Sequence, residues 1–429
     1  MLTSPAFQKK LQGMPAWFIS IYAALCSFGV YFCMYAFRKP FSSAGFDGYR
    51  FLHIDYKVWL VTAQVMGYML SKFYGIRLIA GMRPERRALM IIRLILLAWG
   101  ALLFFALIPP PYNIVFLLIN GFPLGMVWGL VFGYLEGRKT TEFMGAVLCT
   151  TFSLSSGVVK SVGKAVVVDW HFSEFWMPFV TGALFVLPMA VFAWLLNQVP
   201  PPNGEDIRLR SVRNPMTKAE RKLFLSSFLP GIIIIVATYV LLTVLRDFRD
   251  NFANELWTEM GYGGNAGIFT RTEIPVSLVV LLSMSLLILV KSNIRAFLIN
   301  HYIVIGGYLL AFISTLLFSH HMLGPVLWMT FVGTGLYLSY VPFNCLYFER
   351  MIASYNMAGN VGFIMYVADA FGYLGSVLVL FIKQFIGLRL SWTNFFIDII
   401  LSICLFGIGG TILAAIYFRK KYYTLNRAR

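Results

Sequence analysis

Basic side chains in the apolar part of this chain are the residues whose chemistry most needs an explanation. Arg38, Lys72 and Arg246 each stand in or at the end of a long apolar run, where a charge costs at least ~2.5 kcal/mol. Lys160 and Lys164 stand four residues apart in another run, so a helix would place both on one face. A guanidinium binds phosphate or carboxylate through two parallel hydrogen bonds, and lysine adds a mobile positive charge. These residue types predict a binding site for a small anion.

Each of these charges also has a purely structural interpretation. Basic residues near a helix end can extend to the membrane interface, which would account for Arg38 and Lys164. Arg246 could pair with Asp250, four residues later on the same helix. Asp369, an acid in the middle of an apolar run, could pair with one of the two lysines above or support packing between helices. Both kinds of interpretation stay open on the sequence alone.

No catalytic pattern accompanies these charges. The sequence has no HExxH, GxSxG or P-loop pattern and no cluster of His with Asp. The five cysteines lie in apolar runs without a Cys-x-x-Cys pair, which is typical of small buried residues rather than of a metal site or a disulfide framework. The sequence therefore predicts a protein that is not an enzyme, with no cofactor and no metal.

The composition requires a membrane around these charged residues. Of the 429 residues, 59% are hydrophobic and only 12% are charged, about half the ~25% charged fraction of a soluble domain. The mean hydropathy is +0.75, and the apolar runs are long and unbroken, unlike the alternating strands of a membrane barrel. This composition excludes a soluble enzyme, a disordered chain and a coiled coil. It predicts an all-α membrane protein.

Apolar runs long enough to cross a membrane occur twelve times, since a span needs about 20 residues. The predicted fold is therefore twelve transmembrane helices in two six-helix pseudo-repeats. The first six runs cover residues 16–38, 58–80, 88–108, 113–135, 143–167 and 176–196. The second six cover residues 226–250, 272–290, 296–317, 322–346, 356–383 and 392–418.

A polar stretch between the two sets of six divides the chain. We expect an N-terminal half at 1–196, a basic cytoplasmic linker at 197–225, and a C-terminal half with a short basic tail at 226–429. Within the linker, Thr217 followed by Glu220 has the spacing of a capping box. This spacing predicts a short amphipathic helix on the membrane surface.

The two halves share a weak internal similarity, as expected for a duplicated six-helix unit of a secondary transporter. Arg38 near the end of the first run corresponds to Arg246 near the end of the seventh. Three further residues recur at a constant spacing: Tyr134, Glu136 and Met144 correspond to Tyr347, Glu349 and Met357.

The net charge of +17 reflects membrane topology rather than nucleic-acid binding. An even number of spans places both termini on one side, and that side carries most of the 35 lysines and arginines. Cytoplasmic loops of membrane proteins are enriched in these residues. We expect a multi-pass protein of the plasma (inner) membrane with both termini and the linker in the cytoplasm, and no nucleic-acid partner.

Four stretches of the sequence resemble the major facilitator superfamily, and specifically its organophosphate:phosphate antiporter branch, the glycerol-phosphate and hexose-phosphate transporters. They are similar to that branch's motifs on helices 1, 2, 4 and 11. The stretches are residues 35–41 (YAFRKPF), 67–73 (GYMLSKF), 120–128 (NGFPLGMVW) and 371–375 (FGYLG). The resemblance implies the major facilitator fold.

The resemblance also implies a phosphate site held by an arginine on helix 1, a lysine on helix 2 and an arginine on helix 7. By motif match, these roles fall on Arg38, Lys72 and Arg246, with Arg249 as the alternative on helix 7. Two features depart from the branch. The loop after Gly75 lacks the usual acid, and the lysine pair of the fifth run replaces a histidine.

These observations predict a secondary transporter that moves a small anionic metabolite, phosphorylated metabolites included, by alternating access between the halves. The branch implies antiport, with inorganic phosphate or a proton as the coupling ion, and we expect a monomer in the lipid bilayer. The candidate substrate-binding residues are Arg38, Lys72, Arg246, Lys160, Lys164, Asp369 and Arg249.

Two other functions compete with transport. A transporter-like membrane sensor would bind the same anionic ligand without transporting it and would signal to a partner. An appended signalling domain would favour the sensor, and residues 418–429 form only a short tail. A membrane enzyme acting on lipids is disfavoured because the sequence lacks acid–base and nucleophilic groups in a catalytic pattern.

Overall fold

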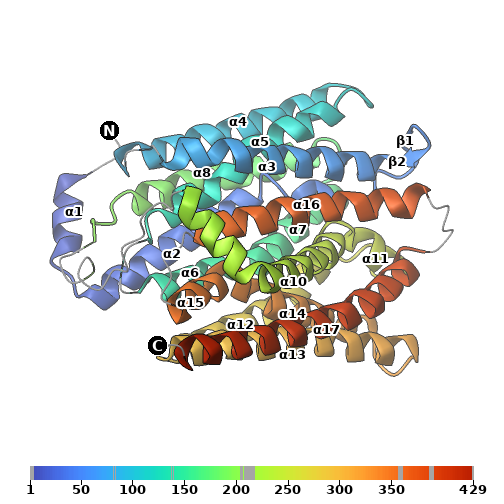
Figure 1. Cartoon of the computed structure of the whole chain (residues 1–429). Helices are drawn as coiled ribbons and strands as arrows, with labels where there is room; N and C mark the ends of the chain where they lie inside the picture. Colours follow the sequence, from blue (N-terminus) through green and yellow to red (C-terminus); the bar gives the residue numbers. More distant parts are fainter. Residues whose placement is uncertain are drawn as a thin grey trace. The chain divides into compact units, whose positions relative to one another are not determined.

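The computed structural model describes residues 4–80, 82, 84–136, 138, 140–202, 206, 218–355, 361–385 and 391–427. This part of the chain is almost entirely helical (Figure 1), apart from a hairpin in which β1 (Arg50–Phe51) pairs with β2 (Ile54–Asp55). The chain divides into two compact units. The first unit contains residues 1–210, 250–274 and 380–388, and the second contains 211–249, 275–379 and 389–429.

The first half of the chain begins with the short helix α1 (Pro5–Gln12) and contains two 3-10 turns, η1 (Pro40–Ser43) and η2 (Pro84–Arg86). Its long apolar segments form six membrane helices, the fifth of which is divided into α6 and α7. These helices are α2 (Ala16–Tyr35), α3 (Tyr56–Ala80), α4 (Arg87–Leu107), α5 (Ile114–Phe132), α6 (Thr141–Cys149) with α7 (Thr151–Val168), and α8 (Met177–Leu196).

The second half also contains six long helices, together with the short α11 (Ala253–Glu259) and α15 (Tyr347–Ser354). The long helices are α10 (Lys218–Asn251), α12 (Ile268–Ile288), α13 (Asn293–Ser319), α14 (Pro325–Cys345), α16 (Val361–Phe385) and α17 (Trp392–Arg427).

The twelve predicted spans match these twelve helical segments. In the described part of the chain, ten segments are long and apolar enough to cross a membrane, with α6 and α7 counted as one. The other two are α3, which carries several charged side chains, and α16, whose apolar stretch Ala368–Ile382 is shorter. The predicted all-α fold with twelve membrane helices is confirmed.

The seventh helix begins earlier than the sequence predicted. Helix α10 starts at Lys218 rather than near residue 226, so it includes the last part of the predicted basic linker. The proposed capping residue Thr217 and residues 207–217 lie outside the described part. The predicted division into halves and linker stays a prediction, and the first compact unit also includes residues 250–274 from the second half.

The same helix pairs pack together in each half. In the first half, the third membrane helix, α4, packs against the fourth, α5, and against the sixth, α8. In the second half, the third helix, α13, packs in the same way against α14 and α17, which lie beside it in Figure 1. This repeated packing is what a duplicated six-helix unit produces.

Glycines permit a close approach between α3 and α5 in the first half. A side chain at Gly67 on α3 would overlap the carbonyl oxygen of Leu118, and a side chain at Gly121 on α5 would overlap that of Gln64. Without a hydrophobic effect inside lipid, such close backbone packing is a main source of helix association. The Asn-Gly-Phe stretch is therefore a packing element as well as a motif.

Candidate functional site

The first group of predicted residues lies around one tyrosine in the N-terminal half. Helix α2 ends at Tyr35, and η1 begins at Pro40, which has no N–H donor, so four residues separate the two elements. Arg38 lies in this connection with only 7% of its surface exposed. Its guanidinium carbon is 3.9 Å from the centre of the Tyr68 ring, and the Lys72 ammonium is 5.1 Å from the same centre.

Helix α3 positions this group through residues that recur every four positions. Gln64, Tyr68 and Lys72 occupy one face of the helix. The Gln64 amide donates to the carbonyl oxygen of Arg38 at 2.9 Å and to the Asn120 side chain at 2.8 Å. Two cations beside one ring concentrate positive charge in a place shielded from water. This arrangement can hold an anion.

The Asn120 side chain connects α5 to α3, to α4 and to the turn after α2. Its amide donates to the carbonyl oxygens of Phe37 and Ala98, at 3.0 and 2.9 Å, and its oxygen accepts the bond from Gln64. Asn120 is fully buried, so each of these bonds satisfies a polar group that would otherwise be costly. Asn120 therefore fixes the backbone next to Arg38.

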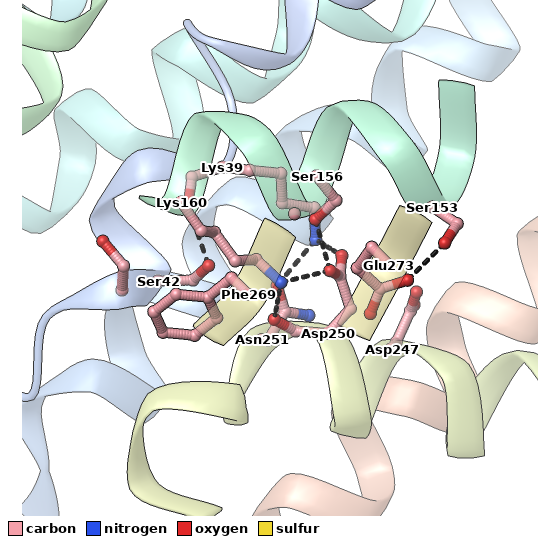
Figure 2. A network of polar contacts seen from close by, with 12 residues as sticks. Lys39, Ser42, Ser153, Ser156, Lys160, Asp247, Asp250, Asn251, Phe269 and Glu273 are labelled. Carbon is pink, nitrogen blue, oxygen red and sulfur yellow. Dashed lines mark hydrogen bonds and ion pairs between the residues drawn. The ribbon is translucent and has the colours of Figure 1, made fainter. Parts of the chain in front are cut away.

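Lys160 lies in a different polar cluster, shown in Figure 2. Its ammonium group pairs with a carboxylate oxygen of Asp250 and donates to the Asp250 carbonyl at 2.5 Å. Lys39 pairs with the other carboxylate oxygen at 2.5 Å and also donates to Asn251 at 2.8 Å. Ser156 donates to the carboxylate at 2.5 Å. We call Lys39, Ser156, Lys160 and Asp250 the Asp250 cluster.

Two residues that follow Asp250 along the chain, Asn254 and Glu255, also contact lysines within the first unit. Lys164 donates to Asn254 at 2.9 Å, and Lys57 pairs with Glu255 at 2.6 Å while donating to the Ser42 carbonyl at 2.8 Å. Burial raises the pKa of the Glu255 carboxyl, and the charge of Lys57 opposes that rise. Buried contacts thus hold the end of α10 and α11 against the N-terminal half.

Arg246 and Asp369 belong to a second polar network, in the C-terminal half. Arg246 pairs with Asp247 at 2.6 Å, and its guanidinium carbon lies 4.0 Å from the centre of the Tyr340 ring. Asp369 accepts a hydrogen bond from the hydroxyl of Tyr239 at 2.5 Å. The Tyr239 and Tyr340 hydroxyl oxygens are also within hydrogen-bond distance, 3.1 Å apart, so the network connects both predicted residues.

Arg249, the alternative on helix 7, contacts α14 instead. Its guanidinium donates to the Met329 carbonyl at 2.9 Å and lies where a side chain at Gly333 would be. The alternative interpretation, a pair between Arg246 and Asp250, does not hold here. Arg246 pairs with Asp247, and Asp250 pairs with Lys39 and Lys160. A pair between Asp369 and one of the fifth-helix lysines stays a prediction.

Several polar residues in these clusters were not among the predicted substrate ligands, namely Lys39, Lys57, Ser156, Asp250, Glu255 and Tyr68. One signal in the sequence could have indicated two of the contacts. Lys160 and Lys164 have the same four-residue spacing as Asp250 and Asn254, and the structure pairs them in that order. Among the described residues, no group of three or more His, Cys, Asp or Glu could hold a metal ion.

A family profile described as "Family of unknown function (DUF5690)" matches residues 40–421, which is most of the chain. The chain belongs to the DUF5690 family. No curated protein sequence gives a significant match.

Two solved structures are similar in fold to this DUF5690 chain. A D-xylose-proton symporter superposes with a TM-score of 0.59 at 15% identity, covering 93% of this chain and 96% of that one. A nucleoside transporter superposes with a TM-score of 0.57 at 13% identity, covering 94% and 99%. At this identity, the similarity shows the fold alone, and it confirms the predicted major facilitator fold. The organophosphate:phosphate antiporter branch is not supported by these neighbours.

Proposed function

We propose that this DUF5690 protein is a secondary transporter of a small anionic metabolite, and that Arg38 and Lys72 contact the anion in the N-terminal half. The observation that carries this proposal is the pair of buried cations beside the Tyr68 ring. A cation inside a membrane protein is costly and is retained where it contacts a pathway or a ligand. The similarity in fold to a sugar symporter and a nucleoside transporter supports transport as the activity.

The C-terminal half would contribute Arg246. Asp247 already neutralises part of its charge, but a guanidinium has five donors, and the bonds from Nε and Nη2 to Asp247 use two of them. The face of the Tyr340 ring holds the guanidinium plane in a fixed orientation. We propose that Arg246 contacts the anion within the C-terminal half, with Asp369 and Tyr239 supporting the Tyr340 ring.

A panel of ligands tests the charge of the substrate. Purified protein is heated with inorganic phosphate, glycerol phosphate, hexose phosphates and simple carboxylates, and with D-xylose and uridine as uncharged comparators. A ligand that binds only the folded protein raises the melting temperature, and the rise continues with the logarithm of its concentration above the dissociation constant. We expect at least one anion to stabilise the protein in this way. Stabilisation by the uncharged sugar or nucleoside and by none of the anions would contradict an anionic substrate.

A sensor that binds the same ligand remains the competing function. Binding alone does not separate the two, since both have an anion site. Movement of the ligand across a membrane separates the two functions, because a sensor would bind the ligand without transporting it.

A further inference from the structure

An aromatic cluster lies in the same compact unit as the two cations of the proposed anion site. The centre of the Trp128 ring on α5 is 5.1 Å from the Tyr31 ring on α2 and 5.1 Å from the Phe152 ring on α7. The Tyr31 and Phe152 rings are 6.1 Å apart, so each ring of the three contacts the other two. We call these three residues the Trp128 cluster.

The packing of α3 against α5 places Trp128 at the level of Lys72. A side chain at Gly125 on α5 would overlap the Ser71 hydroxyl and the Tyr68 carbonyl on α3. Trp128 follows Gly125 by three residues and therefore shares this face of α5, while Lys72 directly follows Ser71. Because the contacts between α3 and α5 advance together along both helices, Trp128 and Lys72 lie at the same level on neighbouring helices.

Helix α2 connects the Trp128 cluster to the other cation, Arg38. Tyr31, Tyr35 and Arg38 are spaced by four and three residues, so they share one face of a helical path. The Tyr31 and Tyr35 rings are 5.6 Å apart. The backbone N–H of Arg38 donates to the Tyr35 carbonyl at 3.0 Å, which continues the turn beyond the end of α2. One face of α2 thus leads from the aromatic rings to the guanidinium.

Trp128 differs from its neighbours in exposure. Tyr31 and Phe152 are 1% and 8% exposed, as expected for packed core residues. Trp128 is only half-buried, although its ring contacts those of two other helices. Packing alone accounts for the two buried rings. The accessible part of Trp128 is aromatic surface that a ligand held by the nearby cations can cover.

We propose that the anion contacted by Arg38 and Lys72 carries an aromatic ring, which lies against Trp128. This inference rests on the proposed function and names its substrate class, an aromatic carboxylate or an aromatic phosphate ester. The two cations bind the oxyanion. The tryptophan contributes a large flat surface, which prefers an offset-stacked or edge-to-face aromatic partner. Apolar walls with a few charged groups that set orientation are typical of small-molecule sites.

Two pairs of probes that differ only in a ring test this inference on the purified full-length protein. Phenyl phosphate is compared with methyl phosphate, and benzoate with acetate, at constant ionic strength. The melting temperature as a function of probe concentration gives each dissociation constant. We expect the ring-bearing probe to bind about tenfold more tightly or more in at least one pair, because it adds an aromatic contact and buried apolar area. The pair with this preference identifies the oxyanion.

Replacing Trp128→Leu tests the position of the ring. We expect it to reduce the preference for the ring-bearing probe to about twofold or less, and to weaken binding of the methyl-bearing probe much less. Trp128→Met supplies the same comparison if Trp128→Leu does not fold, since methionine fills irregular space without a ring.

Trp99→Leu is the matched control. Trp99 on α4 is also half-buried, belongs to the same unit and stacks on a phenylalanine, Phe179, at 5.0 Å. We expect this variant to keep the full preference for the ring. An equal loss in Trp99→Leu and Trp128→Leu, or a preference that persists in both Trp128 variants, would overturn the contact with Trp128.

The wild-type comparison separates this inference from the proposed function. Equal binding within both pairs would overturn the aromatic substrate and leave the proposed anion site in place. If none of the four probes binds, the proposed anion site and this inference fail together.

Discussion

Arg38 is the single residue whose replacement gives the sharpest expectation. Lysine at this position would keep the positive charge but lose the planar contact with the Tyr68 ring and the bidentate geometry for an oxyanion. We expect Arg38→Lys to weaken binding of the stabilising anion by about 1.5–3 kcal/mol, roughly tenfold to a hundredfold. Titration of the melting temperature measures the change.

Arg50→Lys is the control for this replacement. Arg50 lies in the β-hairpin, with 74% of its side chain exposed and 3.5 Å from Asp55, and exposed pairs of this kind contribute little. If Arg38→Lys binds the anion as tightly as Arg50→Lys does, Arg38 is a structural residue and the proposed contact is wrong.

Asp369 and Tyr239 should act as one unit. Their hydrogen bond is short and involves a carboxylate, so each single replacement, Asp369→Asn or Tyr239→Phe, should lower the melting temperature. The double variant should be little worse than the more damaging single one, because the same interaction is removed only once. Tyr302→Phe, at an exposed position, controls for the loss of a hydroxyl. Strictly additive effects would contradict the coupling.

The sequence could identify the buried charges but not most of their partners. Arg38, Lys72, Lys160 and Asp369 are conspicuous because a charge in an apolar run is costly. Their neighbours, such as Tyr68, are ordinary aromatic or polar residues without such a signal. The partner of Lys160 is 90 positions away, and only the packing of α7 against the end of α10 brings the two together.

Among the elements, the pair α3 and α5 depends most directly on single residues. Gly121→Ala would place a methyl group against the Gln64 carbonyl, and overpacking of this kind costs about 1–3 kcal/mol. Gly100→Ala, on α4, meets open space, and alanine is the better helix former by about 1 kcal/mol. We therefore expect opposite signs, with a lower melting temperature for Gly121→Ala and an unchanged or higher one for Gly100→Ala.

A melting temperature for Gly121→Ala at or above that of Gly100→Ala would show that α3 and α5 can separate without loss. The close packing described here would then not be a source of stability.

Helix positions were predictable from the sequence because apolar length and proline turns determine them. Helix α4 ends at Leu107 before the three prolines at 109–111, and α8 ends at Leu196 before those at 200–202. The early start of α10 was not predictable in the same way, because Lys218 and its neighbours are polar. Hydropathy detects the apolar part of a helix and misses polar turns that extend it.

At the scale of the whole molecule, the distribution of basic residues predicts orientation. Both termini and the 197–225 linker should be cytoplasmic, while the loop after α7 should face outward. In a variant with its natural cysteines replaced, a cysteine at the exposed Gly13 should resist a membrane-impermeant thiol reagent in intact cells. A cysteine at the exposed Ser173 should react. The reverse labelling pattern would invert the topology.

Flux of the stabilising anion tests the central claim most directly. The protein is reconstituted into liposomes preloaded with that anion, and uptake of the labelled anion from outside is followed by counterflow. Protein-free liposomes and Arg38→Lys liposomes serve as controls. A transporter should accumulate label transiently above the protein-free level, with slower uptake in Arg38→Lys. Saturable binding of the anion without any uptake above protein-free liposomes would contradict transport and identify a sensor.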